Sequence, residues 1–347
     1  MNTDGSGAGA PLVSVVVPTF NRTRFLPEAL ASAVAQTYAA IEIIVADDAS
    51  SEDVRATVLS RFSDPRIRYQ RNPRNLGMGA NCWTALSRAS GKYVATLHDD
   101  DMWEPDFLAS LVPALEVDES LSVAFCDHQI VDEGGVLDAA ATEANTRLWH
   151  RDRLAPGTLR PFAEAAVVWQ AVPAAMAALF RKSAIDWADF PPEVGTYYDV
   201  WLGYQAARTG AGAHYEPRRL TRYRVHGQSE TRSWTSAAGH LKAMRQAEFV
   251  FGRYLEDPAL ESLRAVLGGL YARKAISLAG ALIDGGATDE ARRILRAARR
   301  RTPRAELKAA LLLALLPSRA SRGLMSTARR LRNLVATVPL DMFKSIP

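Results

Sequence analysis

The apolar positions of the first 126 residues alternate between two spacings. Short strand-like runs, several rich in valine and isoleucine, recur at residues 12–17, 41–46, 66–70, 93–97 and 121–126. Between them, apolar side chains recur every three to four residues, as in an amphipathic helix; the clearest case is Phe25, Leu26, Ala29, Leu30, Ala33 and Val34. Continuous apolar runs are typical of strands buried on both faces. The pattern therefore predicts alternating strands and helices, which build a mostly parallel sheet with flanking helices.

The rest of the chain follows other patterns. Residues 127–170 show no regular spacing, and residues 174–181 are apolar enough for a strand that returns to the sheet. Residues 197–210 have a helical pattern that ends at Gly210. From about residue 238 onward the spacing is helical. The sequence thus predicts an α/β region followed by an α-helical C-terminal region.

Composition narrows the class of protein. The 347 residues are 48% apolar and 23% charged, which is ordinary for a soluble globular protein. Two cysteines, Cys82 and Cys126, argue against a disulfide scaffold and fit a reducing cytosol. The N-terminal residues lack the pattern of a signal peptide, and no run reaches the roughly 18 apolar residues that cross a membrane. We therefore expect a cytoplasmic protein.

The net charge of +4 is unevenly distributed. Residues 241–347 contain 20 Lys+Arg and 9 Asp+Glu, and the totals of 42 and 38 leave 22 and 29 for residues 1–240. Residues 291–304 and 327–335 are basic and amphipathic. Such helices lie at the inner face of a membrane, or they pack as a helical subdomain or homo-oligomer interface, which we favour. Nucleic-acid binding is a third option, but neither interleaved aromatic residues nor a recognised nucleic-acid module supports it, so we expect none.

Carboxylates gather directly after two of the predicted strands. The pair Asp47–Asp48 follows the second strand, and the run Asp99–Asp101 follows the fourth. Because ligands of open α/β sheets collect beyond the carboxyl ends of the strands, both clusters are expected at one rim. Adjacent carboxylates repel one another, and burial raises that cost. Mg²⁺ and Mn²⁺ take oxygen ligands, so the run predicts a divalent-cation site. The alternative is a solvated acidic turn that caps the next helix.

Five stretches between residues 12 and 230 carry recognisable motifs. They read VSVVVPTFNR, VADDASSED, NLGMGANCWTALSRASGKYVATLHDDDMWEPDFL, YYDVWLGYQAARTG and RYRVHGQS. In order and spacing they resemble the motifs of family 2 of the GT-A glycosyltransferases. The resemblance implies a GT-A fold, Rossmann-like with a mostly parallel central sheet.

The resemblance also implies an activity and a division of the chain. The activity is metal-dependent, inverting transfer of a sugar from a nucleotide diphosphate-sugar to a hydroxyl acceptor, in polysaccharide, glycolipid or glycoconjugate biosynthesis. The acceptor is a glycan, a lipid-linked glycan or a small molecule. We expect a leader at 1–10 and a glycosyltransferase domain at 11–237, with a nucleotide-binding half at 11–126 and an acceptor half at 127–237. The basic helical region then occupies 238–347.

By this resemblance, the donor nucleotide is bound by Pro18, Thr19, Asn21, Arg22, Asp48, Asn81 and Asp99. A carboxylate only accepts hydrogen bonds, so Asp48 can receive the imide N–H of uracil or thymine, which favours a UDP- or dTDP-sugar. Pro18, Thr19 and Asn21 would shape the base pocket. Arg22 would approach the diphosphate, or it is a solvated charge at a helix start.

The other two donor contacts have local alternatives. Asn81 would touch the nucleotide, or it caps the loop between strand and helix. Asp99 would bind the ribose or a metal-bound water.

Two residues are assigned to the Mn²⁺ or Mg²⁺ ion by the same resemblance. The family pattern Asp-x-Asp places its second aspartate on Asp100, and its first on His98, which is a departure. His226 in YRVHG would supply a nitrogen to the metal or donate to the diphosphate; alternatively, it is structural.

Asp199 is the candidate general base, which would take the proton of the acceptor hydroxyl. It fits the family's HD.WL variant, with Tyr198 in place of His, whereas the Glu-Asp pair of many members would fall on Thr196–Tyr197. The alternative is an Asp that the helix macrodipole favours near a helix start.

Two other functions compete with this one. A sugar nucleotidyltransferase shares a nucleotide-binding α/β sheet, but it usually has a Gly-rich basic loop where this chain has PTFNR. The departures at His98 and Thr196–Tyr197 also allow a catalytically inactive partner that binds a nucleotide-sugar.

Overall fold

The computed structural model describes residues 9–229 and 236–315. Most of the expected leader at 1–10 and the basic stretch 327–335 lie outside the described residues. Contacts divide the chain into two units, Met1–Arg224 and Val225–Pro347. The boundary expected at residue 237 stays a prediction.

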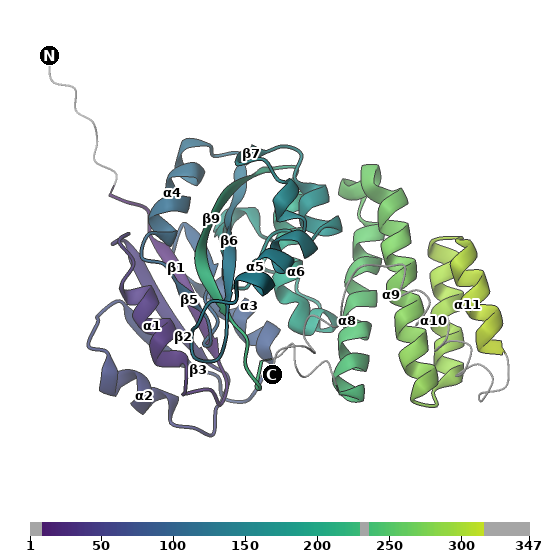
Figure 1. Cartoon of the computed structure of the whole chain (residues 1–347), viewed down its shortest axis with the longest axis horizontal. Helices are drawn as coiled ribbons and strands as arrows, with labels where there is room; N and C mark the ends of the chain where they lie inside the picture. The colour runs from purple at the N-terminus through teal and green to yellow at the C-terminus, as the bar shows by residue number, and fades with distance from the viewer. Residues whose placement is uncertain (1–8, 230–235, 316–347) are drawn as a thin grey trace, which may run out of the picture. The chain divides into compact units, whose positions relative to one another are not determined.

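The first unit is built on a mixed, mostly parallel sheet (Figure 1). Its strands are β1 (Val13–Thr19), β2 (Ile41–Asp47), β3 (Ile67–Arg71), β4 (Tyr93–Thr96), β5 (Met102–Trp103), β6 (Leu121–Val131), β7 (Gly157–Leu159), β8 (Ala178–Arg181) and β9 (Gly212–Arg224). Their order is β3-β2-β1-β4-β8-β6-β9-β5, and β7 pairs with β9. β1 is parallel to β2 and β4, whereas β8 is antiparallel to β4 and β6. The predicted fold class is confirmed.

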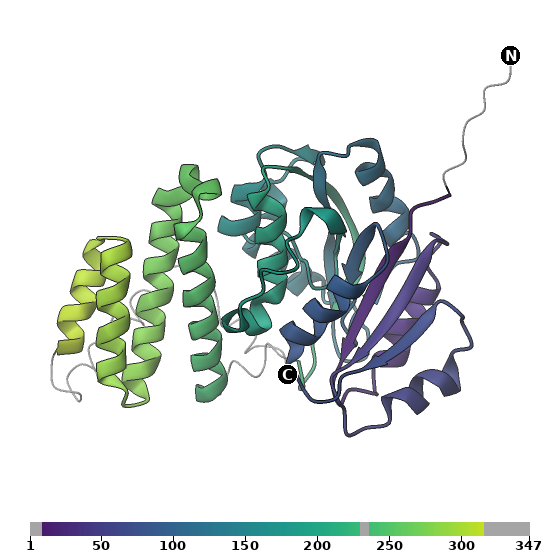
Figure 2. The same ribbon diagram turned by 180° about the vertical axis from the view of Figure 1, so that it is seen from behind.

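Helices cover both faces of this sheet. They are α1 (Leu26–Val34), α2 (Val54–Arg61), α3 (Met78–Arg88), α4 (Phe107–Val117), α5 (Ala139–Leu148) and α6 (Tyr198–Arg208). The apolar sides of α1 and α4 share one core cluster with alternate residues of β1 and β4, such as Val15 and Ala95. The next residue of β4, Thr96, points the other way and lies 3.7 Å from the Cys82 sulfur on α3. Thus α3 covers the opposite face, which Figure 2 shows from behind.

Residues 127–170 are more regular than their sequence pattern suggests. β6 continues to Val131, and Asp138 caps α5 by accepting a hydrogen bond from the Ala141 N–H. Short helical turns follow at Arg151–Arg153 and Glu164–Val168. The expected strand at 174–181 forms only over Ala178–Arg181, as β8.

The close approach of α3 to the loop before α6 leads to a stability prediction. A Cβ on Gly79 would lie 1.8 Å from the Gly195 carbonyl oxygen, and backbone cannot move aside cheaply. We expect Gly79→Ala to lower the free energy of unfolding by about 1–3 kcal/mol. In Gly203→Ala, the matched control on α6, the new Cβ would meet only Val172 Cβ at 4.0 Å. Urea denaturation should show unchanged or higher stability for the control, and equal midpoints for both variants would contradict the packing described.

The second unit is helical. It contains α8 (Ala237–Glu256), a short turn at Pro258–Leu263, α9 (Arg264–Asp284), α10 (Thr288–Arg301) and α11 (Ala305–Leu315). α10 buries Ala291, Leu295 and Ala298 and exposes Arg293 and Arg296. This basic helix is therefore packed on its apolar side and carries its arginines on the surface.

One segment of the second unit differs from the sequence expectation for membrane spans. Pro258–Asp284 is long and apolar enough to cross a membrane by length and composition, although 61% of its most apolar window is buried. A core helix of a globular protein passes the same test, so the segment is weak evidence for a span.

Candidate functional site

The two acidic clusters lie at the same rim of the sheet. β2 and β4 flank β1 and both run parallel to it, with Thr19 opposite Asp47 and Val16 opposite Thr96. Asp48 follows the end of β2, and the run Asp99–Asp101 follows β4. Their carboxyl ends therefore meet beside the end of β1, as the strand pattern predicts.

The acidic run is almost completely buried. Asp99 is 3% exposed, Asp100 7% and Asp101 1%. Burial and the neighbouring Asp100 charge raise the pKa of Asp99 to about 7, and they raise the pKa of Asp101 well above its usual range. The Arg22 guanidinium lies 3.0 Å from Asp100 Oδ2 and 3.6 Å from Asp99 Oδ1. Because these carboxylates lie close together, their negative charges favour the binding of a proton or a cation.

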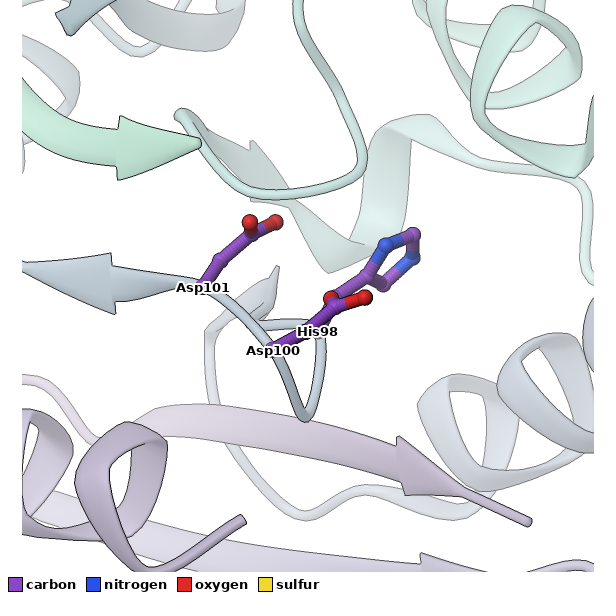
Figure 3. A group of neighbouring side chains, drawn as sticks. All are labelled: His98, Asp100 and Asp101. Atoms are coloured by element: carbon purple, nitrogen blue, oxygen red, sulfur yellow. The ribbon is translucent and has the colours of Figure 1, made fainter. Parts of the chain in front are cut away.

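His98, Asp100 and Asp101 form a candidate metal centre (Figure 3). One ligand atom from each lies within 4.8 Å of the others. Asp101 Oδ1 accepts a hydrogen bond of 3.0 Å from the Arg224 N–H, whereas its buried Oδ2 has no hydrogen-bond partner among the described residues. A buried carboxylate oxygen without a partner is costly unless a cation compensates it. The residues present thus fit a divalent ion.

Sequence reasoning placed only Asp100 of this trio on the metal. Asp101 carried a readable signal, because it ends the acidic run, but nothing in the sequence shows that its side chain turns toward His98. His98 was recognised only as a departure from Asp-x-Asp. Burial, aided by the Arg22 charge, lowers the pKa of His98 and keeps its imidazole neutral, the form that binds metals.

Asp48 organises the loop between β3 and α3. Its Oδ1 accepts hydrogen bonds from the Leu76 N–H at 2.8 Å and the Asn72 amide at 2.9 Å, and its Oδ2 accepts one from the Gly77 N–H at 2.8 Å. Asn81 donates to the Ala46 carbonyl at 2.8 Å. These contacts are structural, and they hold the carboxylate of Asp48 in a fixed position at the rim.

The end of β1 is fastened to the turn after β2. Asn21 adopts a left-handed φ of 52°, and its side-chain oxygen accepts a hydrogen bond of 2.7 Å from the Ser51 N–H. Pro18 and Thr19 are buried, and the hydroxyl oxygen of Thr19 has no partner within the part of the chain that is described. Asn21 therefore shapes the rim, while Thr19 offers a polar atom next to Asp99.

α6 reaches the acidic turn through its first residue. Tyr198 is buried, and its hydroxyl oxygen lies 2.5 Å from Nε2 of His98. The next residue, Asp199, is partly buried, and burial raises the pKa of its carboxyl to about 6. Asp199 Oδ1 accepts a hydrogen bond of 2.8 Å from the Val200 N–H. Asp199, the candidate base, is therefore adjacent in sequence to Tyr198, which contacts the acidic turn.

His226 belongs to the second unit, whereas the acidic turn belongs to the first. Its side chain is 4% exposed, and its Nδ1 accepts a hydrogen bond of 3.3 Å from the Gln228 N–H. Its assignment to the metal stays a prediction.

Comparison with known proteins relates part of the first unit to a family of glycosyltransferases. Residues 14–167 match the model of glycosyl transferase family 2. Over 126 residues the chain is 32% identical to the UDP-Glc:alpha-D-GlcNAc-diphosphoundecaprenol beta-1,3-glucosyltransferase WfgD of Escherichia coli, covering 36% of this chain and 49% of that protein. The chain spans 16 to 49% of the length of the first curated relatives it matches.

Solved structures share the fold. TarS from S. aureus in complex with UDP-GlcNAc aligns over 92% of this chain and 91% of that chain, with a TM-score of 0.61 and 16% identity. The mannosyltransferase PcManGT of Pyrobaculum calidifontis, in complex with GDP-Man and Mn²⁺, aligns over 94% and 88%, with a TM-score of 0.54 and 20% identity. At these identities the likeness shows the GT-A fold alone.

Proposed function

Because residues 14–167 place this chain in glycosyl transferase family 2, we propose that it is a metal-dependent, inverting glycosyltransferase that moves a sugar from a nucleotide diphosphate-sugar to a hydroxyl acceptor. The observation that carries the proposal is the buried acidic turn at the rim beside Asp48, with an unpartnered carboxylate oxygen on Asp101 within the described residues. The acceptor would be a glycan, a lipid-linked glycan or a small molecule.

The residues of the rim would divide the work of binding the donor. Asp48 would accept the imide N–H of a pyrimidine base, because its carboxylate is held in place by the loop it organises. Arg22 would approach the diphosphate, exchanging part of its contact with Asp100 for phosphate oxygens. Asp100, with His98 and Asp101, would hold Mn²⁺ or Mg²⁺. A bound divalent ion supplies positive charge that stabilises a leaving diphosphate.

Asp199 would activate the acceptor. In a direct displacement the acceptor hydroxyl loses its proton as its oxygen attacks the anomeric carbon, on the face opposite the diphosphate. A carboxylate in hydrogen-bond reach takes that proton, and its efficiency rises as its pKa approaches the working pH. The pKa of about 6 makes Asp199 a better base than an ordinary aspartate.

The raised pKa of Asp199 predicts the pH dependence of turnover. The base acts only when ionised, so kcat should rise with pH up to about 6 and then level off. Below that value each pH unit should cost about tenfold in kcat. The measurement is kcat at saturating donor and acceptor across this range. A kcat that stays constant well below the pKa of Asp199 would contradict its role as base.

A donor panel tests the proposed function. Purified protein is incubated with UDP-, dTDP- and GDP-sugars, Mn²⁺ and a set of glycan, lipid-linked glycan and small-molecule hydroxyl acceptors, with and without chelator, and nucleotide diphosphate release is measured together with a thermal shift. A ligand of the folded state raises stability with ln(1 + [L]/Kd). We expect a UDP- or dTDP-sugar to give both a shift and cation-dependent release.

The alternatives give different outcomes in the same panel. A catalytically inactive partner gives a thermal shift without turnover. A sugar nucleotidyltransferase releases no nucleoside diphosphate from these donors, and it releases pyrophosphate when the donors are replaced by a nucleoside triphosphate and a sugar phosphate. Either outcome overturns the proposal.

We also propose the cellular compartment in which the protein acts. Cys82 and Cys126 are both buried and free of disulfides, which supports a reducing, cytoplasmic setting. The arginines on the surface of α10 would allow contact with an anionic membrane, where lipid-linked acceptors reside, or with a second copy of the chain.

A further inference from the structure

We infer that His98, oriented by Tyr198, is a nitrogen ligand of the divalent cation and makes the site prefer Mn²⁺ over Mg²⁺. The inference rests on the proposed function, which requires a cation at the acidic turn. The set of ligands would be one nitrogen and two carboxylates, from His98, Asp100 and Asp101.

The two nitrogens of His98 have different surroundings. Nε2 lies 2.5 Å from the Tyr198 hydroxyl oxygen. In Figure 3 one of the two ring nitrogens of His98 lies on the side of the ring that faces Asp101. A neutral imidazole carries its proton on one nitrogen only. If Nε2–H donates to Tyr198, Nδ1 keeps a lone pair for a cation.

Tyr198 is held so that it can accept this hydrogen bond. It is 1% exposed at the start of α6, where burial and the nearby thiol of Cys82 contribute to raising the pKa of its hydroxyl. Cys82 in turn lies 3.7 Å from the Thr96 hydroxyl. The Tyr198 hydroxyl has two acceptor lone pairs, so it can accept a hydrogen bond from His98. Outer partners of this kind fix the tautomer and orientation of metal-binding histidines.

The carboxylates of Asp100 and Asp101 complete the proposed set of metal ligands. Asp101 Oδ1 is engaged by the Arg224 N–H, which leaves the buried Oδ2 without a protein partner in the described part of the chain. Mg²⁺ favours oxygen ligands, whereas imidazole nitrogen suits transition metals. A set with one imidazole thus selects Mn²⁺ over Mg²⁺.

Cation binding is measured directly, with MnCl₂ as the probe. Free Mn²⁺ is followed by electron paramagnetic resonance during titration of the whole protein, and MgCl₂ is added as competitor. His98→Asp, which restores an oxygen ligand, should reduce the preference for Mn²⁺ by on the order of tenfold. Tyr198→Phe, which removes one hydroxyl, should weaken Mn²⁺ binding by about tenfold. His214→Ala, on β9, is the control and should leave the affinity for Mn²⁺ and the preference for Mn²⁺ over Mg²⁺ unchanged.

Electron spin echo modulation from a coordinated ¹⁴N nucleus identifies the ligand. The Mn²⁺-loaded wild type should show it, His98→Ala should lose it, and His226→Ala should keep it. Two results would overturn the inference. The first is loss of the ¹⁴N modulation in His226→Ala alone. The second is that both His98→Asp and Tyr198→Phe keep the wild-type affinity and preference for Mn²⁺. Donor turnover in the same samples is a separate readout: normal transfer without a nitrogen signal refutes only the inference, and a nitrogen signal without transfer from any donor refutes the proposed function.

Discussion

Replacing Asp199 by asparagine is expected to lower kcat by about 10²–10⁴-fold, the usual contribution of a general base. The substitution keeps the size of the side chain and removes the ionisable oxygen that would take the acceptor proton. Donor binding should persist, because the residues assigned to the donor lie at the ends of β1, β2 and β4 and on α3, whereas Asp199 lies on α6. The measurement pairs kcat with the thermal shift caused by the nucleotide-sugar in Mn²⁺.

A matched control separates chemistry from local structure. Asp186 lies on the exposed loop before α6, where it accepts a hydrogen bond of 3.1 Å from the Ala188 N–H. Asp186→Asn should leave kcat near the wild-type value. If Asp199→Asn turns over donor as fast as Asp186→Asn, the base is another residue.

The second large effect concerns stability. Arg151→Met should lower the free energy of unfolding by about 3–5 kcal/mol, because it leaves Asp127 buried without its main counter-charge. Arg151 Nε lies 2.6 Å from Asp127 Oδ1, and the two residues are each 2% exposed. Burial alone would raise the pKa of Asp127, but the charge of Arg151 and the Thr146 hydroxyl hold it below its usual value.

The sign of the pH dependence follows from that lowered pKa. In the wild type, the contribution of Asp127 to stability is present above the ordinary aspartate pKa of about 3.9 and is lost as pH falls through the lower folded-state value. The difference in the free energy of unfolding between the wild type and Arg151→Met should therefore be largest near neutral pH.

Two further variants check this account by urea denaturation. Asp127→Leu combined with Arg151→Met should recover most of the loss, since an apolar pair of similar volume replaces a buried ion pair well. Arg160→Met breaks an exposed pair with Asp118, at 2.7 Å, and should cost less than about 1 kcal/mol. Equal losses in Arg151→Met and Arg160→Met would show that Asp127 does not depend on Arg151.

How far the sequence predicts the fold depends on where each strand lies. β1, β2 and β4 are buried on both faces and mostly apolar, because helices cover both sides of the sheet there, so their sequence pattern is clear. β9 was recognised only near its end, in RYRVHG. Its arginines form ion pairs with side chains such as Asp106 and Glu104, which a single sequence does not reveal. The direction of β8 could not be predicted either, since pairing is a long-range property.

The candidate site, like the fold, can be predicted from the sequence only in part. The rim position of Asp48 and Asp100 follows from strand order, which the alternation of strands and helices predicts. The contact of His98 with Tyr198 joins residues 100 positions apart, and no local pattern encodes it. The structural contacts of Asp48 and Asn21 are also invisible in sequence, because their partners are backbone groups of neighbouring loops.

A crystal structure of the protein with UDP and Mn²⁺ tests the central claim most directly. Anomalous scattering locates the manganese independently of the protein atoms. We expect one manganese peak bonded to the carboxylate of Asp100 and to the diphosphate, with the uracil against Asp48. A diphosphate bound away from the acidic turn, or a uracil at the far side of the sheet from Asp48, would contradict the account.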